Sequence, residues 1–132
     1  MKDKHDLTRG WLAKAESDLV TARLVLDSLG PYDTVCFHAQ QAIEKALKGF
    51  LAFHGLPIPR THDLEELQRL CLEIQQLPGI EDLDLTQLTD YAVVMRYDFD
   101  FWPDVQTAAD ALTLAEQVRQ FILKALPRSC HP

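Results

Sequence analysis

Apolar side chains recur at three- and four-residue spacing along most of the chain, and the alternation expected of a half-buried strand is almost absent. This periodicity predicts five helices, at about residues 8–29, 33–54, 61–77, 85–95 and 104–126. Asp33, Thr61 and Asp104 stand where N-cap side chains are expected. Four long amphipathic helices with short links predict an all-α fold: an antiparallel up-and-down four-helix bundle with one extra short helix.

The first predicted helix carries apolar residues on two sides. Its inner stripe consists of Trp11, Ala15, Leu19, Ala22, Leu26 and Leu29. Val20 and Leu24 fall on the opposite side of the helix. They are either scattered surface residues, which are common in monomers, or part of a contact between subunits. Periodicity alone does not decide between these two interpretations.

The second predicted helix contains the segment FHAQQAIEKALKGFLAFHG, residues 37–55, which mixes polar residues with small apolar ones. Steps of 100° per residue gather an apolar stripe of Val35, Ala39, Ala42, Ile43, Ala46, Phe50 and Phe53. The far side carries four polar residues: His38, Gln41, Lys45 and Lys48. They form either a solvated face, with Gln41–Lys45 and Glu44–Lys48 pairs, or a surface that holds a phosphate group or an acidic partner.

The length and composition fit one globular domain. The chain has 132 residues, of which 47% are hydrophobic and 25% are charged. A chain of this size can bury a sufficient core without disulfides or metal. We therefore expect a single domain over residues 1–132, with its core at about 8–126 and a frayed tail at 127–132.

The negative charge is concentrated in one segment. Residues 81–110 contain eight acidic side chains and one basic side chain, Arg96, and the whole chain has a formal net charge of −7. General binding to DNA relies on clustered lysine and arginine residues that neutralise phosphates. This distribution argues against general DNA binding, and it remains compatible with a local pocket for one nucleotide or for an RNA end.

The cysteines and the apolar runs indicate the compartment. Cys36, Cys71 and Cys130 are odd in number and show no CxxC spacing, which argues against a disulfide framework and a zinc knuckle. No apolar run reaches the roughly 20 residues of a membrane span, and the N-terminus lacks the apolar core of a signal peptide. We expect a cytoplasmic protein with no membrane association, no metal site and no cofactor other than a nucleotide ligand.

Four segments carry a resemblance to a known family: AESDLVTARLVL in the first helix, QQAIEKALK in the second, THDLEEL at the start of the third, and RYDF ahead of the last helix. Together they resemble the HEPN family. Their spacing follows the family pattern from about residue 8 to residue 126, and QQAIEKALK is the most specific of them. The resemblance implies an all-α up-and-down bundle that dimerises.

The resemblance also implies a function and partners. Small prokaryotic HEPN proteins are often paired with a minimal nucleotidyltransferase encoded beside them, in systems where the HEPN protein is a toxin and the partner its antitoxin. Such toxins are metal-independent RNases that use an arginine followed four to six residues later by a histidine. Arg96 stands at the expected place for this arginine, but the next histidine is His131 in the tail. Without that imidazole the usual proton-transfer group is missing.

Three further features are candidates for chemistry. Arg96 either forms an ion pair or binds phosphate through its planar guanidinium. In the segment YDFDFWPD, Tyr97, Phe99 and either Phe101 or Trp102 are expected to pin the loop while the aspartates face water. Asp98 or Asp100 is also a candidate substitute for the missing histidine. His62 either fixes its loop by hydrogen bonds or lines a groove beside the second helix.

The leading hypothesis is a HEPN-type homodimer that binds a nucleotide or RNA phosphate and works with a nucleotidyltransferase. Its candidate binding residues are His38, Gln41, Lys45, Lys48, His62 and Arg96. The first alternative is an RNase that uses Arg96 with Asp98 or another unusual acid/base. The second is a non-catalytic helical dimerisation module whose polar residues are solvated.

Overall fold

The computed structural model describes residues 2–92 and 97–132. Within these residues the chain forms helices and no strand, so the predicted all-α class is confirmed for them. The α-helices are α1 (Lys4–Asp27), α2 (Tyr32–Phe53), α3 (Leu64–Ile74), α4 (Thr86–Thr89) and α5 (Val105–Lys124). Two short 3-10 helices are η1 (Asp90–Ala92) and η3 (Arg128–Cys130). No helix in the described ranges has both the length and the hydropathy that a bilayer crossing requires.

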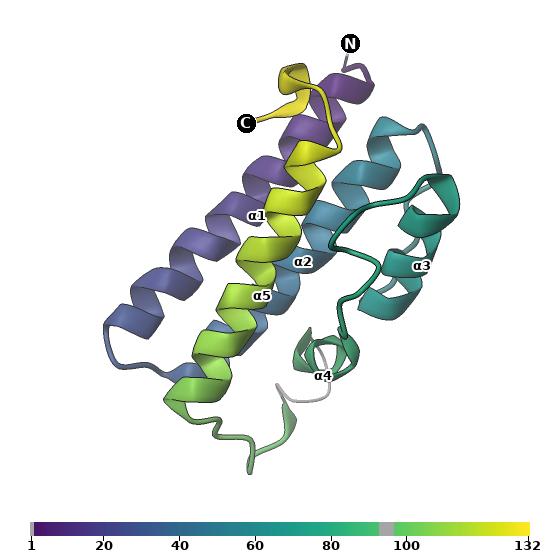
Figure 1. The fold of residues 1–132 in the computed structure, drawn as a ribbon. Coiled ribbons are helices and arrows are strands. Elements are labelled where there is room, and N and C mark those ends of the chain that lie inside the picture. Colours follow the sequence, from purple (N-terminus) through teal and green to yellow (C-terminus); the bar gives the residue numbers. More distant parts are fainter. Residues whose placement is uncertain (1, 93–96) are drawn as a thin grey trace.

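The three long helices lie side by side, with α2 against both α1 and α5 (Figure 1). The two ends of the chain lie at the same end of the molecule, where α1 begins and α5 finishes. α3 has 11 residues against 20 to 24 in the long helices, and it packs along α2 rather than spanning the full length. The architecture is therefore three long helices, α1, α2 and α5, with the shorter helices α3 and α4 attached to one side.

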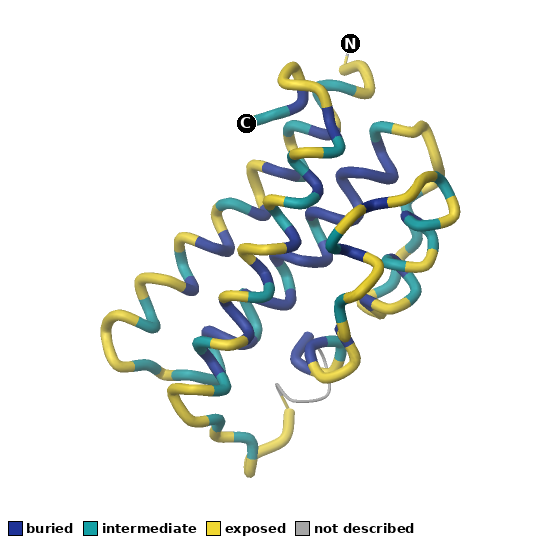
Figure 2. Tube along the Cα trace, viewed as in Figure 1, coloured by how far each residue is buried: buried dark blue, intermediate teal, exposed yellow. Residues whose placement is uncertain are grey.

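α2 occupies the centre because its sequence tolerates contact on almost every side. Fourteen of its 22 residues are buried, against six of 24 in α1 and six of 20 in α5. Figure 2 shows this helix as an almost continuous dark segment. The small side chains of Ala39, Ala42 and Ala46 let neighbouring helices approach closely. A helix in this position must also find partners for its buried polar residues, Gln40, Glu44 and Lys48.

The helix starts differ from the predictions in three places. α1 begins earlier because Asp3 and Asp6 form a reciprocal capping box, which the apolar pattern does not reveal. Asp33 does not cap α2: it lies inside the first turn, after the N-cap residue Pro31. Asp63, rather than Thr61, caps α3 by accepting hydrogen bonds from two backbone N–H groups of the first turn. Short polar side chains compete for the cap position, and the local backbone decides among them.

The cap of the last helix is as predicted. The Asp104 carboxylate accepts a hydrogen bond of 2.8 Å from the backbone N–H of Thr107. This bond lowers the pKa of Asp104.

Two predictions about where helices end are wrong. The helix expected at 85–95 is α-helical only over Thr86–Thr89 and continues as η1, and its last residues lie outside the described ranges. Leu29, expected in the inner stripe, lies beyond the end of α1 with 84% of its surface exposed. Its φ of 67° falls in the left-handed region, which terminates the helix before the side chain can turn inward.

The C-terminal tail packs against the start of α1, although the sequence predicted that it would fray. His5 Nδ1 lies 2.7 Å from Ser129 Oγ, and Arg9 donates to the Ser129 carbonyl. Cys130 is fully buried, and His131 Nε2 donates to the Leu123 carbonyl at 2.9 Å. Local sequence patterns do not reveal these contacts, because the partners of Ser129 on α1 are 120 and 124 residues away in sequence.

Two helical glycines provide a matched test of the contact between α1 and α2. A Cβ added at Gly49 would lie 3.1 Å from Trp11 Cβ, whereas a Cβ at Gly10 would meet no described atom within 4 Å. Gly10→Ala should raise the free energy of unfolding by roughly 0.5–1 kcal/mol through helix propensity. Gly49→Ala gains the same propensity but incurs an overpacking cost of roughly 1–3 kcal/mol, so we expect no gain or a net loss. Urea denaturation measures both, and equal stabilisation by the two substitutions would contradict the close packing.

Candidate functional site

The polar residues of α2 are not a solvated face. They lie between α1 on one side and the segment that precedes α3 on the other. Their charge partners are two buried carboxylates, Asp18 of α1 and Glu44 of α2 itself, and Glu44 also meets His62 of the segment before α3. We call this set the α2 polar network. It consists of Asp18, His38, Gln40, Gln41, Glu44, Lys45, Lys48 and His62.

Asp18 of α1 organises the first half of the network. One carboxylate oxygen lies 2.8 Å from His38 Nδ1, and the other accepts a hydrogen bond of 2.6 Å from Lys45 Nζ. The Asp18 residue is only 7% exposed, whereas about a quarter of each partner side chain reaches solvent. Because a carboxylate can only accept, Nδ1 of His38 is the donor nitrogen, and Nε2 of a neutral ring remains an acceptor.

Glu44 organises the second half of the network. One oxygen accepts a hydrogen bond of 3.0 Å from Lys48 Nζ, and the other lies 2.7 Å from His62 Nδ1. The Glu44 and Lys48 side chains are 6% and 8% exposed, so this is a buried ion pair. The Lys48 ammonium also lies 5.8 Å from the centre of the Trp11 ring.

The two glutamines connect the second half of the network to the loop. Gln40, which is fully buried, donates from Nε2 to Glu44 at 3.3 Å and to the backbone carbonyl of His62 at 3.2 Å. Gln41 donates to the Gln40 side-chain oxygen at 2.7 Å. These bonds fix the position of the loop that enters α3, so the loop-fixing role predicted for His62 is present.

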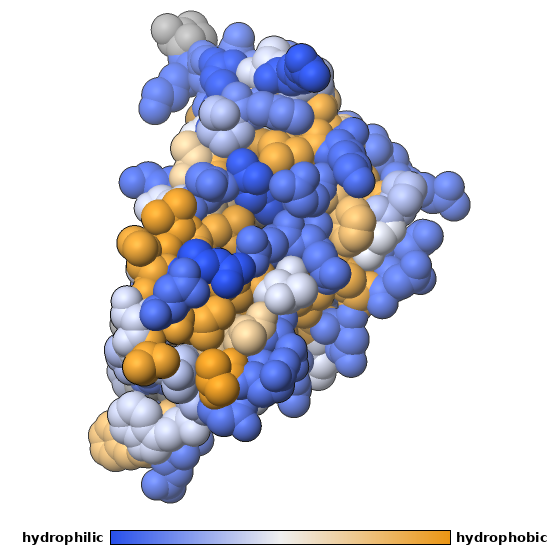
Figure 3. Space-filling view, turned by 60° about the vertical axis from the view of Figure 1, so that its left-hand side comes forward, coloured by the Kyte–Doolittle hydropathy of each residue, from blue (hydrophilic) through white to orange (hydrophobic). Residues whose placement is uncertain are grey.

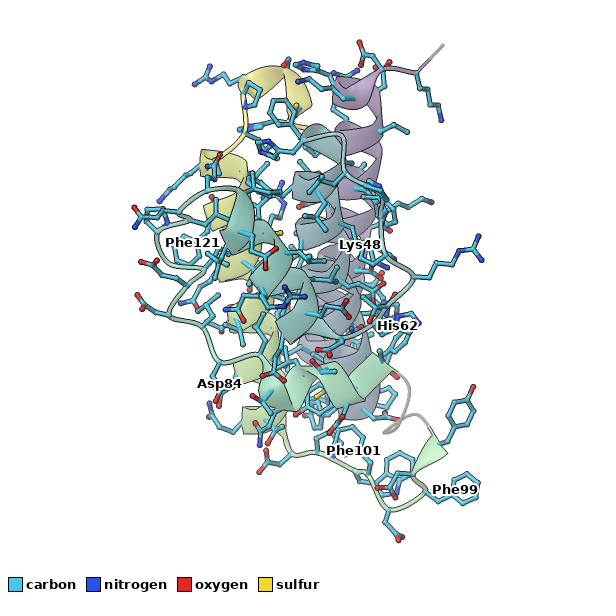
Figure 4. The ribbon with its side chains drawn as sticks, turned by 90° about the vertical axis from the view of Figure 1, so that its right-hand side faces the viewer. Lys48, His62, Asp84, Phe99, Phe101 and Phe121 are labelled. Atoms are coloured by element: carbon cyan, nitrogen blue, oxygen red, sulfur yellow. The ribbon has the colours of Figure 1, made fainter. Side chains whose placement is uncertain are left out.

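The accessible part of the network is smaller than the sequence suggested. Lys48 lies inside the bundle, whereas His62 lies at its edge with 55% of its side chain exposed (Figure 4). His38 and Lys45 are also partly exposed. An incoming anion can therefore meet His38, Lys45 and His62, while Lys48 serves to neutralise Glu44. With both histidines neutral, two lysines balance two carboxylates.

Of the two side-chain pairs predicted within α2, one forms and the other does not. Glu44–Lys48 forms as expected but is buried rather than solvated. The Gln41–Lys45 pair does not form, because Gln41 bonds to Gln40 and Lys45 bonds to Asp18. The solvated interpretation of this face is wrong for Lys48, which is buried, whereas His38, Gln41 and Lys45 are partly exposed and bonded to other side chains.

The structure describes only one of the two candidate catalytic residues, Asp98. Arg96 lies outside the described residues. Asp98 is exposed, and its carboxylate accepts a hydrogen bond of 2.9 Å from the backbone N–H of Asp100, which makes a local turn.

The aromatic residues of the same segment divide into one anchor and three exposed side chains. Phe101 stacks on Tyr91 with 5.3 Å between ring centres, and it points into the molecule while Phe99 projects away (Figure 4). Tyr97, Phe99 and Trp102 are 73%, 88% and 72% exposed. Pinning was expected from Tyr97, Phe99 and either Phe101 or Trp102, so the prediction holds for Phe101 and fails for Tyr97 and Phe99.

Asp18 and Gln40 are the members that the sequence analysis did not single out. Asp18 lies three residues after Ala15 and four before Ala22, so it falls next to the inner stripe of α1. An acidic residue at a buried helical position requires a charged partner, and that requirement was the available signal. Gln40 gave no comparable signal, because its one partner outside α2, the His62 carbonyl, lies in a loop.

Metal and thiol chemistry find no support in the described part of the chain. No group of three or more histidine, cysteine, aspartate or glutamate side chains there is placed to hold a metal ion. Burial raises the pKa of the Cys36 and Cys71 thiols to about 12, so both remain protonated and unreactive at neutral pH.

Comparison with protein families gives one match. The model of the HEPN domain matches residues 8–126, which is nearly the whole chain. Comparisons with curated proteins and with solved structures gave no match.

The burial of the Glu44–Lys48 pair can be tested against an exposed pair of the same spacing. Arg69 and Glu73 on α3 form an i,i+4 pair with about 60% of each side chain exposed. Glu44→Gln leaves Lys48 buried without its counter-charge and should lower the free energy of unfolding by roughly 3 kcal/mol. Glu73→Gln should change it by less than about 0.5 kcal/mol.

Urea denaturation of the two variants beside the wild type gives both numbers. Equal, small effects would show that the Glu44 site is hydrated and that the network is not a buried one.

Proposed function

The chain belongs to the HEPN domain family, whose model covers nearly all of it, and on that premise we propose that it binds a nucleotide or an RNA phosphate. We further propose the family's antiparallel four-helix bundle, assembled as a homodimer, as the form that does so. The family is associated with RNases and with nucleotide-related roles. The α2 polar network supplies the residues for the binding role.

One observation carries this proposal. Three partly exposed nitrogen-bearing side chains are held by the two buried carboxylates: His38 and Lys45 by Asp18, and His62 by Glu44. Charged donors whose positions are fixed in advance lose little conformational entropy when they bind an anion. A ligand phosphate at these residues would add a second acceptor for Lys45 without moving Asp18 or Glu44, and a histidine would donate to it from Nε2 in the doubly protonated form of its ring.

The balance of charge explains why the expected binding is selective rather than general. The network carries no excess of lysine over carboxylate, so long-range attraction of polyanions is weak. A compact terminal phosphate, which makes short directional hydrogen bonds, suits such a site better than a continuous nucleic-acid backbone.

A second candidate function is metal-independent cleavage of RNA. The observation that favours it is the His38–Asp18 pair, in which a buried carboxylate orients an imidazole that still reaches solvent. A carboxylate-oriented histidine is a common acid/base arrangement. It would take the place of the histidine that is missing after Arg96 in the sequence.

The proposed biological setting is a pair with a minimal nucleotidyltransferase, as the family pattern suggests for small prokaryotic HEPN proteins. In that setting the chain is the HEPN half of a toxin–antitoxin-like system, with its phosphate site presented to the partner or to RNA. A nucleotidyltransferase reading frame beside the gene supports this pairing, and its absence there counts against it.

Nucleotide binding is tested by thermal shift with ATP and with a 5′-phosphorylated RNA oligonucleotide. We expect the Tm of the wild type to rise by roughly 3–6 °C at a ligand concentration tenfold above Kd. Lys45→Ala and His62→Gln should abolish the shift, whereas Lys14→Ala, which removes an exposed lysine from α1, should leave it unchanged.

The result that contradicts the binding proposal is a wild type whose Tm responds to neither ligand. The same proteins incubated with RNA and a chelator test the second candidate. Cleavage that stops in His38→Ala and in Arg96→Ala would assign the enzyme function instead.

A further inference from the structure

The outer face of α1 carries a second apolar seam that no described element covers. Its members are Ala13, Ser17, Val20 and Leu24, all exposed, at spacings of four, three and four residues. Val20 and Leu24 are 50% and 63% exposed. Figure 3 shows apolar side chains gathered on the side of the molecule where α1 comes forward, with strongly polar groups crossing them. This spacing is the one by which two helices interlock along a narrow seam.

Two ion pairs across the neighbouring helices frame this seam. Glu16 of α1 pairs with Arg119 of α5, with Oε2 and Nε 2.6 Å apart. Arg23 of α1 pairs with Glu116 of α5 at 2.7 Å. Between the pairs lies a groove of about 310 Å³, lined in part by Leu19, Val20 and Leu24.

The four charges alternate in sign around the face. Along α1, the negative Glu16 precedes the positive Arg23, and beside each of them α5 presents the opposite sign. A two-fold axis that lies in this face, perpendicular to α1, exchanges the two ends of the helix. It therefore sets Glu16 of one copy opposite Arg23 of the other, and Arg119 opposite Glu116. The face is complementary to itself and has no excess charge to attract nucleic acid or a charged membrane.

The side chains along the seam fit the same axis. Glu16 and Arg23 lie about 10 Å apart along the helix, so the midpoint between them falls within one residue of Val20. Val20 then meets Val20 of the second copy at the axis. Leu24 reaches the level between Ala13 and Ser17 of the second copy, where small side chains leave a space for it.

We propose that a second copy of this chain docks here, with α1 packed antiparallel to α1 of the partner across a two-fold axis beside Val20. The proposal deepens the homodimer of the proposed function by naming its surface. It does not depend on the phosphate site, because the α2 polar network faces the interior side of α1 and the loop before α3.

Sedimentation equilibrium on substituted proteins tests the surface. Val20→Asp and Leu24→Asp place a carboxylate on the seam without disturbing the core, and each should weaken dimerisation at least about tenfold. Leu7→Asp is the matched control: it lies on the same helix with 48% exposure but on another side, and it should leave the dimer unchanged. A monomeric wild type at micromolar concentration, or a Val20→Asp protein that remains dimeric, overturns the proposal. If the Phe99→Asp protein dissociates while the Val20→Asp protein remains dimeric, the interface lies at the exposed aromatic residues instead.

Disulfide trapping tests the axis directly. All three native cysteines are buried, so a new surface thiol is the reactive one. Val20→Cys should give a covalent dimer under mild oxidation, because residues at a two-fold axis approach within the roughly 7 Å between Cα atoms that a disulfide needs. Ala13→Cys, about 10 Å from the axis on each copy, should not cross-link. Cross-linking of Ala13→Cys without cross-linking of Val20→Cys would reject the antiparallel arrangement. The rise in Tm on adding nucleotide, measured on the same variants, shows separately whether the phosphate site is intact.

Discussion

The structure depends on two carboxylates, Asp18 and Glu44, that lie almost entirely out of water. Each is a charge that burial would penalise by several kcal/mol if it stood alone. Each is instead met by a lysine of α2 and a histidine within 3.0 Å. This pairing is what allows a helix with two lysines and two glutamines to occupy the centre of the bundle. It also fixes α2 relative to α1 and to the loop before α3.

The same pairing shapes the candidate function. The carboxylates remove the net charge of the lysines but hold Lys45, His38 and His62 in defined positions at the surface. A site of this kind favours a small anion with directional acceptors over a long polyanion. The proposed class of ligand comes from membership of the HEPN family, and the place proposed for it is the α2 polar network.

Local sequence patterns predicted most of the fold, because the hydrophobic periodicity is regular along α1, α2, α3 and α5. The errors occurred where distant residues decide: the tail bound by His5 and Arg9, the short α4, and the burial of the α2 polar residues. Of the site, the sequence provided His38, Lys45 and His62 through spacing and resemblance. It did not provide Asp18 as the partner of His38 and Lys45, because a single sequence does not show which helix faces which.

The measurement that tests this account most directly is a double-mutant cycle between Asp18 and Lys45, using Asp18→Asn, Lys45→Met and the double variant. Urea denaturation of the four proteins gives the coupling free energy between the two side chains. A buried, mutually dependent pair predicts a coupling of about 2 kcal/mol or more, with the double variant more stable than the sum of the single losses implies. A coupling below about 0.5 kcal/mol, the value typical of a solvated surface pair, would contradict the account.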